Sequence, residues 1–142
     1  PELFERRPFE IGKGNLLKDG KDVAIISTGT LTANVLDAAD VLAEKGYDPM
    51  VIGMPTINPI DEELIEFAAR KTGRIVTVEE HYIPGGLGTI VSEVCSRTFP
   101  VHVKMLGVPK TYATSGPYNG ILEFYGLDVK GIVNSVIDFI NK

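Results

Sequence analysis

Short apolar runs alternate with longer amphipathic segments along most of this chain, and this alternation restricts its fold more than any other feature. The first run is 23–26 (Val-Ala-Ile-Ile), and mostly apolar runs follow at 50–54, 74–78 and 100–106. A continuous apolar run of this length is typical of a strand that is covered on both faces. The sequence therefore predicts buried strands at these positions, joined by the segments between them.

The segments between these runs carry apolar side chains at helical spacing. The first runs from Leu31 to Leu42, and the last and clearest from Val129 to Ile140, where apolar residues recur at i, i+3, i+4, i+7, i+8 and i+11. Asp61 and Asp128 stand where helix N-caps are expected. Alternating strands and helices predict right-handed βαβ units and a mainly parallel sheet between layers of helices. Further helical segments are expected at 61–69, 90–95 and 121–125.

Charge and length exclude several classes of protein. The chain has 14 basic and 19 acidic side chains and no basic run, so neither nucleic acid nor an anionic membrane is expected as its partner. Its apolar stretches are shorter than the ~20 residues that span a bilayer. With the single Cys95, no internal disulfide can form, which fits a reducing compartment, and we expect a cytoplasmic protein.

The beginning of the chain differs from the regular part that follows it. The 142 residues suit one domain, and the first of them is Pro1 rather than Met, as though the chain were cut from something longer. We expect residues 1–8 to be a linker or arm from an absent preceding domain and residues 9–142 to be the domain itself. Within it, 9–11 and 15–17 could form a short hairpin around Gly12-Lys13-Gly14.

The most suggestive segment for chemistry is 78–88, which joins the end of a predicted strand to the start of a helix. Ligands gather at such positions in open α/β sheets. Its acidic residues and histidine could make an acid–base site, or the helix N-terminus could hold an anion. Alternatively, the glycines supply tight turns and close packing, while the glutamates are solvated or meet a partner. The candidate interface or anion-binding residues are Glu79, Glu80, His81, Gly85, Gly86 and Gly88.

The remaining polar candidates are weaker, and together they do not complete a catalytic site. Adjacent carboxylates on a strand face opposite ways, so Glu79 and Glu80 are not a paired acid–base couple. Cys95 lies mid-helix among valines and is interpreted as a packing residue, and His102 as a surface or satisfied histidine. The loop at 111–117 has hydroxyls that could bind something. No Walker sequence or Gly-x-Ser-x-Gly motif occurs in the chain.

Several short segments, in this order and spacing, give the chain a family resemblance. They are 19–29, 38–46, 59–61 (Pro-Ile-Asp), 77–81 (Thr-Val-Glu-Glu-His) and 85–88 (Gly-Gly-Leu-Gly). From about Phe9 to its end the chain resembles the C-terminal domain of the transketolase family. The ending 123–128, leading into 131–133, looks like transketolase or deoxyxylulose-phosphate synthase, and His81 after two glutamates looks like transketolases that are split into two subunits.

The resemblance implies a fold and a role. The fold is three-layered α/β/α, with a five-stranded, mostly parallel sheet that has one antiparallel edge strand, to which the region 9–17 would contribute. The role is that of the C-terminal, non-cofactor-binding domain of a transketolase, which supports dimerisation and active-site assembly. The expected partners are the pyrimidine- and diphosphate-binding domains or subunits of the same enzyme, together with homodimer contacts.

The resemblance also implies where the cofactor would lie. These enzymes move a two-carbon ketol unit between sugar phosphates with thiamine diphosphate and a divalent metal such as Mg²⁺, both held between two other domains. One of those domains carries a Gly-Asp-Gly motif, which does not occur in this chain. No catalytic, cofactor-binding or metal-binding residue can therefore be mapped here, and we expect the isolated chain to be inactive.

Other functions stay open at this point. The chain could be the C-terminal domain of deoxyxylulose-phosphate synthase or of a 2-oxoacid dehydrogenase β subunit. It could instead be a module that binds an anionic effector or a partner at the edge 80–88. A third hypothesis is a self-sufficient small enzyme that uses His81 with Glu79 or Glu80.

Overall fold

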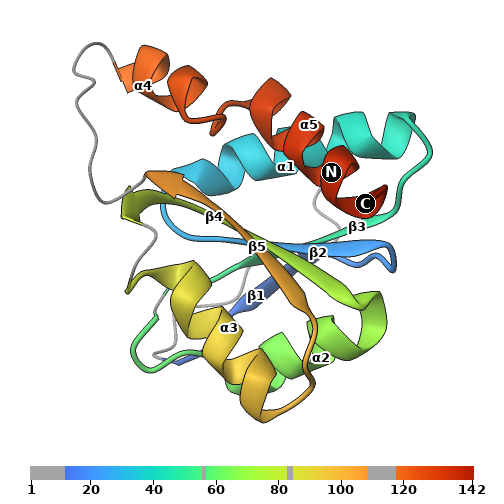
Figure 1. The fold of residues 1–142 in the computed structure, drawn as a ribbon, viewed down its shortest axis with the longest axis vertical. Helices are drawn as coiled ribbons and strands as arrows, with labels where there is room; N and C mark the ends of the chain where they lie inside the picture. The colour runs from blue at the N-terminus through green and yellow to red at the C-terminus, as the bar shows by residue number, and fades with distance from the viewer. Residues whose placement is uncertain (1–11, 56, 83–84, 109–117) are drawn as a thin grey trace.

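The computed structural model (Figure 1) describes residues 12–55, 57–82, 85–108 and 118–142, and these residues form five strands and five helices, which alternate over residues 23–124. The linker predicted at 1–8, the first arm of the predicted hairpin at 9–11 and the loop at 111–117 lie outside the described residues. In chain order the elements are β1 (Asn15–Lys18), β2 (Val23–Ser27), α1 (Leu31–Glu44), β3 (Pro49–Gly53), α2 (Glu62–Thr72), β4 (Arg74–Tyr82), α3 (Leu87–Arg97), β5 (His102–Val108), α4 (Tyr118–Phe124) and α5 (Val129–Ile140).

The strands form one sheet in the order β1-β3-β2-β4-β5. β2 pairs in parallel with β3 and with β4, and β4 pairs in parallel with β5. β1 runs antiparallel to β3, with Asn15 opposite Gly53. The predicted mostly parallel sheet with one antiparallel edge strand is therefore confirmed, and β1 joins the sheet edge as the family resemblance implies.

Helices cover both faces of the sheet, which gives the three layers. In Figure 1, α1 and α5 lie above the sheet and α2 and α3 below it. The central strands are buried on both faces, and their alternate side chains enter two separate cores. Ile25 and Val76 pack with residues of α1 and α5. Ala24 and Ile75 pack with residues of α2 and α3. Burial on both faces explains why the strands are continuously apolar.

Two aspartates begin helices as the sequence predicts. The Asp61 carboxylate accepts a hydrogen bond from the Leu64 amide at 3.1 Å, and the Asp128 carboxylate accepts one from the Gly131 amide at 2.9 Å. Each bond satisfies an amide that has no partner within its own helix. The second oxygen of Asp61 accepts from the Gly14 amide at 3.0 Å, which ties the residues before β1 to the start of α2.

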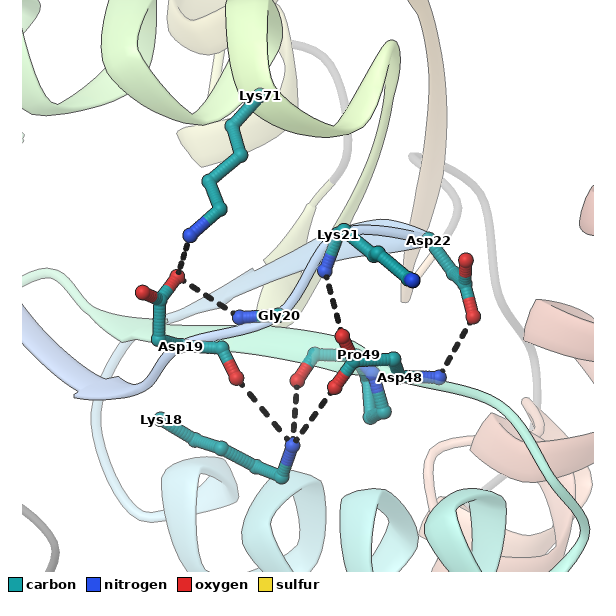
Figure 2. A network of polar contacts seen from close by, with 8 residues as sticks. All are labelled: Lys18, Asp19, Gly20, Lys21, Asp22, Asp48, Pro49 and Lys71. Atoms are coloured by element: carbon teal, nitrogen blue, oxygen red, sulfur yellow. Dashed lines mark hydrogen bonds and ion pairs between the residues drawn. The ribbon is translucent and has the colours of Figure 1, made fainter.

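The turn between β1 and β2 is fastened to the start of β3 by a polar network (Figure 2). The Asp48 amide donates to the Asp22 carboxylate at 2.7 Å, and the Asp22 amide donates to the Asp48 carbonyl at 2.9 Å. The Lys18 ammonium donates to the Pro49 carbonyl at 3.0 Å. Gly20 lies so close to the Pro49 backbone that no Cβ would fit. This part of the family-like segment 19–29 is therefore structural, at the amino ends of β2 and β3.

The same turn also contacts α2. The Lys71 ammonium lies 2.7 Å from the Asp19 carboxylate, and this hydrogen bond lowers the pKa of Asp19 below its ordinary value. Both side chains are substantially exposed, so the ion pair contributes little to stability.

β4 is longer than the sequence predicts. The predicted strand ends at Val78, whereas the observed strand continues to Tyr82. The residues Glu79 to Tyr82, which the sequence places between this strand and the following loop, are thus part of the strand. The pairing with β5 shifts register between Val78 and Tyr82, where Tyr82 lies opposite Val108. This irregularity marks the point at which the candidate site begins.

Candidate functional site

The candidate site lies at the carboxyl end of β4, beside the carboxyl end of β2. These two strands are neighbours in the sheet, with Ser27 opposite Val78. The helix that follows β2, α1, packs on one face of the sheet, and the helix that follows β4, α3, packs on the other. Strand ends at which the connections leave in opposite directions are where open α/β sheets place ligands.

Glu79 is almost completely buried, with 2% of its surface exposed, and its carboxylate begins α3. One oxygen accepts from the Leu87 amide at 2.9 Å and the other accepts from the Gly88 amide at 3.0 Å. The N-cap residue, Gly86, has no side chain to do this. A carboxylate is favoured at a helix N-terminus because the free amides and the helix dipole both stabilise negative charge.

The surroundings of Glu79 bear on two hypotheses from the sequence: that this residue is solvated, and that the start of α3 binds an anion. The expectation that Glu79 is solvated is wrong, because the residue is enclosed between β4 and α3. An anion at this helix N-terminus would compete with Glu79 for the Leu87 and Gly88 amides, which the carboxylate already engages. The Glu79 carboxylate, from the preceding strand, therefore occupies the place at which an anion would bind the start of α3.

Close packing beneath the first turn of α3 explains the glycine at position 88. A Cβ there would lie 2.5 Å from Met105 Cγ and 2.7 Å from Thr77 Oγ1. Thr77 is fully buried, and its hydroxyl has no hydrogen-bond partner in the described structure. The expected packing role of a glycine in this segment therefore has a geometric basis at Gly88.

Glu80 faces the opposite side of the sheet from Glu79. The Thr30 hydroxyl, just before α1, donates to the Glu80 carboxylate at 3.2 Å. Glu80 is partly exposed, whereas Glu79 is buried. The prediction that the two carboxylates diverge is confirmed, and they do not form an acid–base couple.

The histidine of this segment stays a prediction. His81 belongs to β4, but its side chain lies outside the described part of the structure, so no contact supports or excludes an acid–base role. The exposed Gly85 donates from its amide to the Thr89 hydroxyl at 3.1 Å, which ties the connection to the first turn of α3.

Sequence reasoning missed three hydroxyl residues: Thr30, Thr77 and Thr89. Thr77 could have been found, because it lies two residues before Glu79 and therefore on the same face of the strand. Thr30 could not, because its contact with Glu80 joins residues 50 positions apart.

The other sequence candidates lie apart from this site. Cys95 is buried in α3, as predicted, and burial raises the pKa of its thiol. His102 is exposed on β5 and packs edge-on against Phe139, with ring centroids 5.1 Å apart.

The search for a metal site covers the described residues alone. Within them, no three His, Cys, Asp or Glu side chains come together in a group that could hold a metal ion. The buried carboxylate of the candidate site, Glu79, accepts hydrogen bonds from two backbone amides. Of the helices described, none has the length and apolar character to cross a membrane.

The family of the chain follows from comparison with known proteins. The family described as "Transketolase, C-terminal domain" matches residues 12–132. One of the subunits of apulose-4-phosphate transketolase from Phocaeicola vulgatus is 42% identical over the whole chain, which covers 46% of that protein. A 1-deoxy-D-xylulose-5-phosphate synthase from Geobacter sulfurreducens is 39% identical over 96% of the chain, which covers 22% of the synthase.

Solved structures support the same assignment. A split-gene transketolase, described as an inactive beta4 tetramer, is 40% identical and superposes with a TM-score of 0.87, with 99% of this chain and 46% of that one covered. Transketolase from Campylobacter jejuni shares the fold, with a TM-score of 0.67 at 19% identity over 97% of this chain and 20% of its own. The chain thus spans less than half the length of these relatives. It belongs to the family of transketolase C-terminal domains.

Proposed function

We propose that this chain serves as the C-terminal, non-cofactor-binding domain of a thiamine-diphosphate-dependent transketolase, where it supports subunit association and active-site assembly. The observation that carries the proposal is the 42% identity, over the whole chain, with one of the subunits of a transketolase. In the whole enzyme the cofactor and Mg²⁺ would be bound by other domains or subunits. No catalytic step is assigned to a residue of this chain.

The geometry at the end of β4 favours a structural role for Glu79 over a catalytic one. A carboxylate that acts as a general acid or base must reach a reacting group, and Glu79 is buried and bonded to two backbone amides. Its position favours a residue that fixes the connection between β4 and α3. This counts against a small enzyme that uses Glu79 with His81, and against an effector anion at the same two amides.

A second candidate is the corresponding domain of deoxyxylulose-phosphate synthase. The 39% identity with the Geobacter sulfurreducens enzyme supports it. Both candidates place the same fold beside cofactor-binding domains, so they differ in the parent reaction and not in the role of this chain.

Calorimetry tests whether the chain binds the cofactor by itself. The chain is titrated with thiamine diphosphate and Mg²⁺, and we expect no saturable heat. Stoichiometric binding would contradict the proposal, because the chain would then hold a cofactor site of its own.

A domain exchange separates the two candidates. The matching part of the Phocaeicola vulgatus transketolase is replaced by this chain, and the same exchange is made in the Geobacter sulfurreducens synthase. We expect the first hybrid to keep more of its parent activity than the second. Better retention by the synthase hybrid would favour the second candidate, and two folded but inactive hybrids would contradict the proposed role.

A further inference from the structure

The three methionines of the chain differ in how much of their surface is exposed. Met50 and Met54 belong to the core on the α2 and α3 face and are 0% and 1% exposed, whereas Met105 is 36% exposed. Met105 lies on β5, an edge strand of the sheet, and no described strand pairs with the outer side of β5. Among the methionines, Met105 is therefore the one that an oxidant in solution reaches most easily.

The exposed side chain of Met105 also packs beneath the first turn of α3. A Cβ at Gly88 would lie 2.7 Å from Met105 Sδ and 2.7 Å from Thr77 Oγ1, so the sulfur and the hydroxyl flank the same point. Thr77 and Met105 also lie opposite each other in the pairing of β4 with β5. One side chain thus connects the solvent with the buried contact between β4 and α3.

The Thr77 hydroxyl is an unsatisfied donor beside this sulfur. Among the described residues, it is the only buried side-chain nitrogen or oxygen that has no hydrogen-bond partner. A thioether sulfur is a weak acceptor, whereas oxidation to the sulfoxide makes the methionine side chain polar. A sulfoxide oxygen on Met105 would therefore supply the acceptor that the Thr77 hydroxyl lacks.

The space beside the Thr77 hydroxyl has no room for another atom unless α3 moves. The contact at Gly88 is already too close for a methyl group. The first turn of α3 is held at this place by the hydrogen bonds from the Leu87 and Gly88 amides to the Glu79 carboxylate. Because protein interiors are close-packed, an added oxygen would displace this turn and weaken these two bonds.

We propose that Met105 is a redox-sensitive site, at which peroxide oxidises the thioether and the start of α3 is released from β4. One oxygen atom of hydrogen peroxide bonds to the Met105 sulfur, the O–O bond breaks, and the other oxygen leaves with both hydrogens as water. The sulfur loses the two electrons that the peroxide gains, and the new oxygen accepts from the Thr77 hydroxyl. Methionine sulfoxide reductases reverse the change. The proposal goes beyond the proposed function and does not depend on it.

Peptide mass spectrometry tests the site on the 142-residue chain treated with dilute hydrogen peroxide. A Cys95→Ala background removes the thiol, so that the methionines are compared alone. Met105 should gain one oxygen atom roughly tenfold faster than Met50 and Met54, because oxidation follows exposure. Equal or faster oxidation of either buried methionine would overturn the proposal.

Hydrogen exchange tests the consequence in the chain oxidised at Met105 alone. The Leu87 and Gly88 amides should exchange about tenfold faster than in the reduced chain, and enzymatic reduction should restore the slow rates, while the amides of β2 stay protected. Met105→Leu is the matched control, because leucine has a similar volume and no sulfur. Unchanged rates in the oxidised chain, or equally accelerated exchange in peroxide-treated Met105→Leu, would overturn the proposal.

The Thr77→Val variant tests the direction that the oxygen takes. Without the hydroxyl donor, the sulfoxide oxygen should turn to the solvent, and oxidation at Met105 should leave the Leu87 and Gly88 amides slow. Acceleration as large as in the oxidised parent chain would contradict the proposed role of the Thr77 hydroxyl. Calorimetry with thiamine diphosphate and the domain exchange need no oxidant, so failure here is distinguishable from failure of the proposed function.

Discussion

Glu79 and Glu80 are neighbours in the chain, but the structure gives them opposite surroundings. Glu79 is sealed between β4 and α3, where both of its oxygens accept from backbone amides. Glu80 lies on the other face, partly exposed, and accepts from the Thr30 hydroxyl. The difference shows that the Glu79 carboxylate serves the packing of α3 on the sheet, whereas the Glu80 carboxylate lies at the solvent-accessible side of the candidate site.

Loss of the Glu79 side chain should have the largest effect. Glu79→Ala leaves the amides of Leu87 and Gly88 buried without partners, and each such group costs about 1–3 kcal/mol, so we expect a loss of about 4 kcal/mol in the free energy of unfolding. Urea denaturation measures it. A loss below about 2 kcal/mol, the low end of that range for two amides, would contradict the structural role assigned to Glu79.

A methyl group at position 88 should have the next largest effect. The new Cβ of Gly88→Ala would clash with Met105 and Thr77, and overpacking of this kind costs about 1–3 kcal/mol. The control is Gly120→Ala at an exposed position of α4, where a Cβ meets no described atom within 4 Å, so stability should be unchanged or slightly raised. Equal stability of the two variants in thermal denaturation would contradict the close contact beneath α3.

Removal of the buried hydroxyl at position 77 should raise the free energy of unfolding, whereas the two substitutions above lower it. Thr77→Val keeps the shape of the side chain and removes a polar atom that has no described partner, so we expect stability to rise by about 1 kcal/mol. A loss of similar size in urea denaturation would show that the hydroxyl is satisfied, and that the buried side of β4 is more polar than the structure indicates.

Substitution of Glu80 should have the smallest effect on folding. Its hydrogen bond with Thr30 is solvent-exposed, and such contacts contribute only about 0.2–1 kcal/mol. Glu80→Ala should therefore stay within about 1 kcal/mol of the parent chain in the same urea experiment. A larger loss would erase the contrast with Glu79.

Much of the fold was predictable because its signals are local. The apolar runs of β2 and β3 and the caps Asp61 and Asp128 are each defined within a few residues, and the structure confirms all of them. The extension of β4 was not predictable in this way. The residues after Val78 are polar and lie beyond the apolar run, and they belong to the strand because the pairing of β4 with β5 extends to Tyr82, opposite Val108.

The candidate site was only half predictable for a related reason. Alternation along a strand establishes that Glu79 and Glu80 diverge, but both faces of this sheet are covered, so alternation does not tell which glutamate is buried. That depends on where α3 begins, and Gly88 allows its first turn to approach β4 closely.

Amide hydrogen exchange at Leu87 and Gly88 tests the central claim, that the Glu79 carboxylate holds the start of α3 on β4, most directly. In the parent chain and in Glu80→Ala, both amides should exchange slowly, as bonded and buried groups do. In Glu79→Gln, which keeps the size of the side chain but offers a single acceptor oxygen, at least one amide should exchange much faster while the central strands stay protected. Fast exchange of both amides in the parent chain, or unchanged rates in Glu79→Gln, would contradict the account.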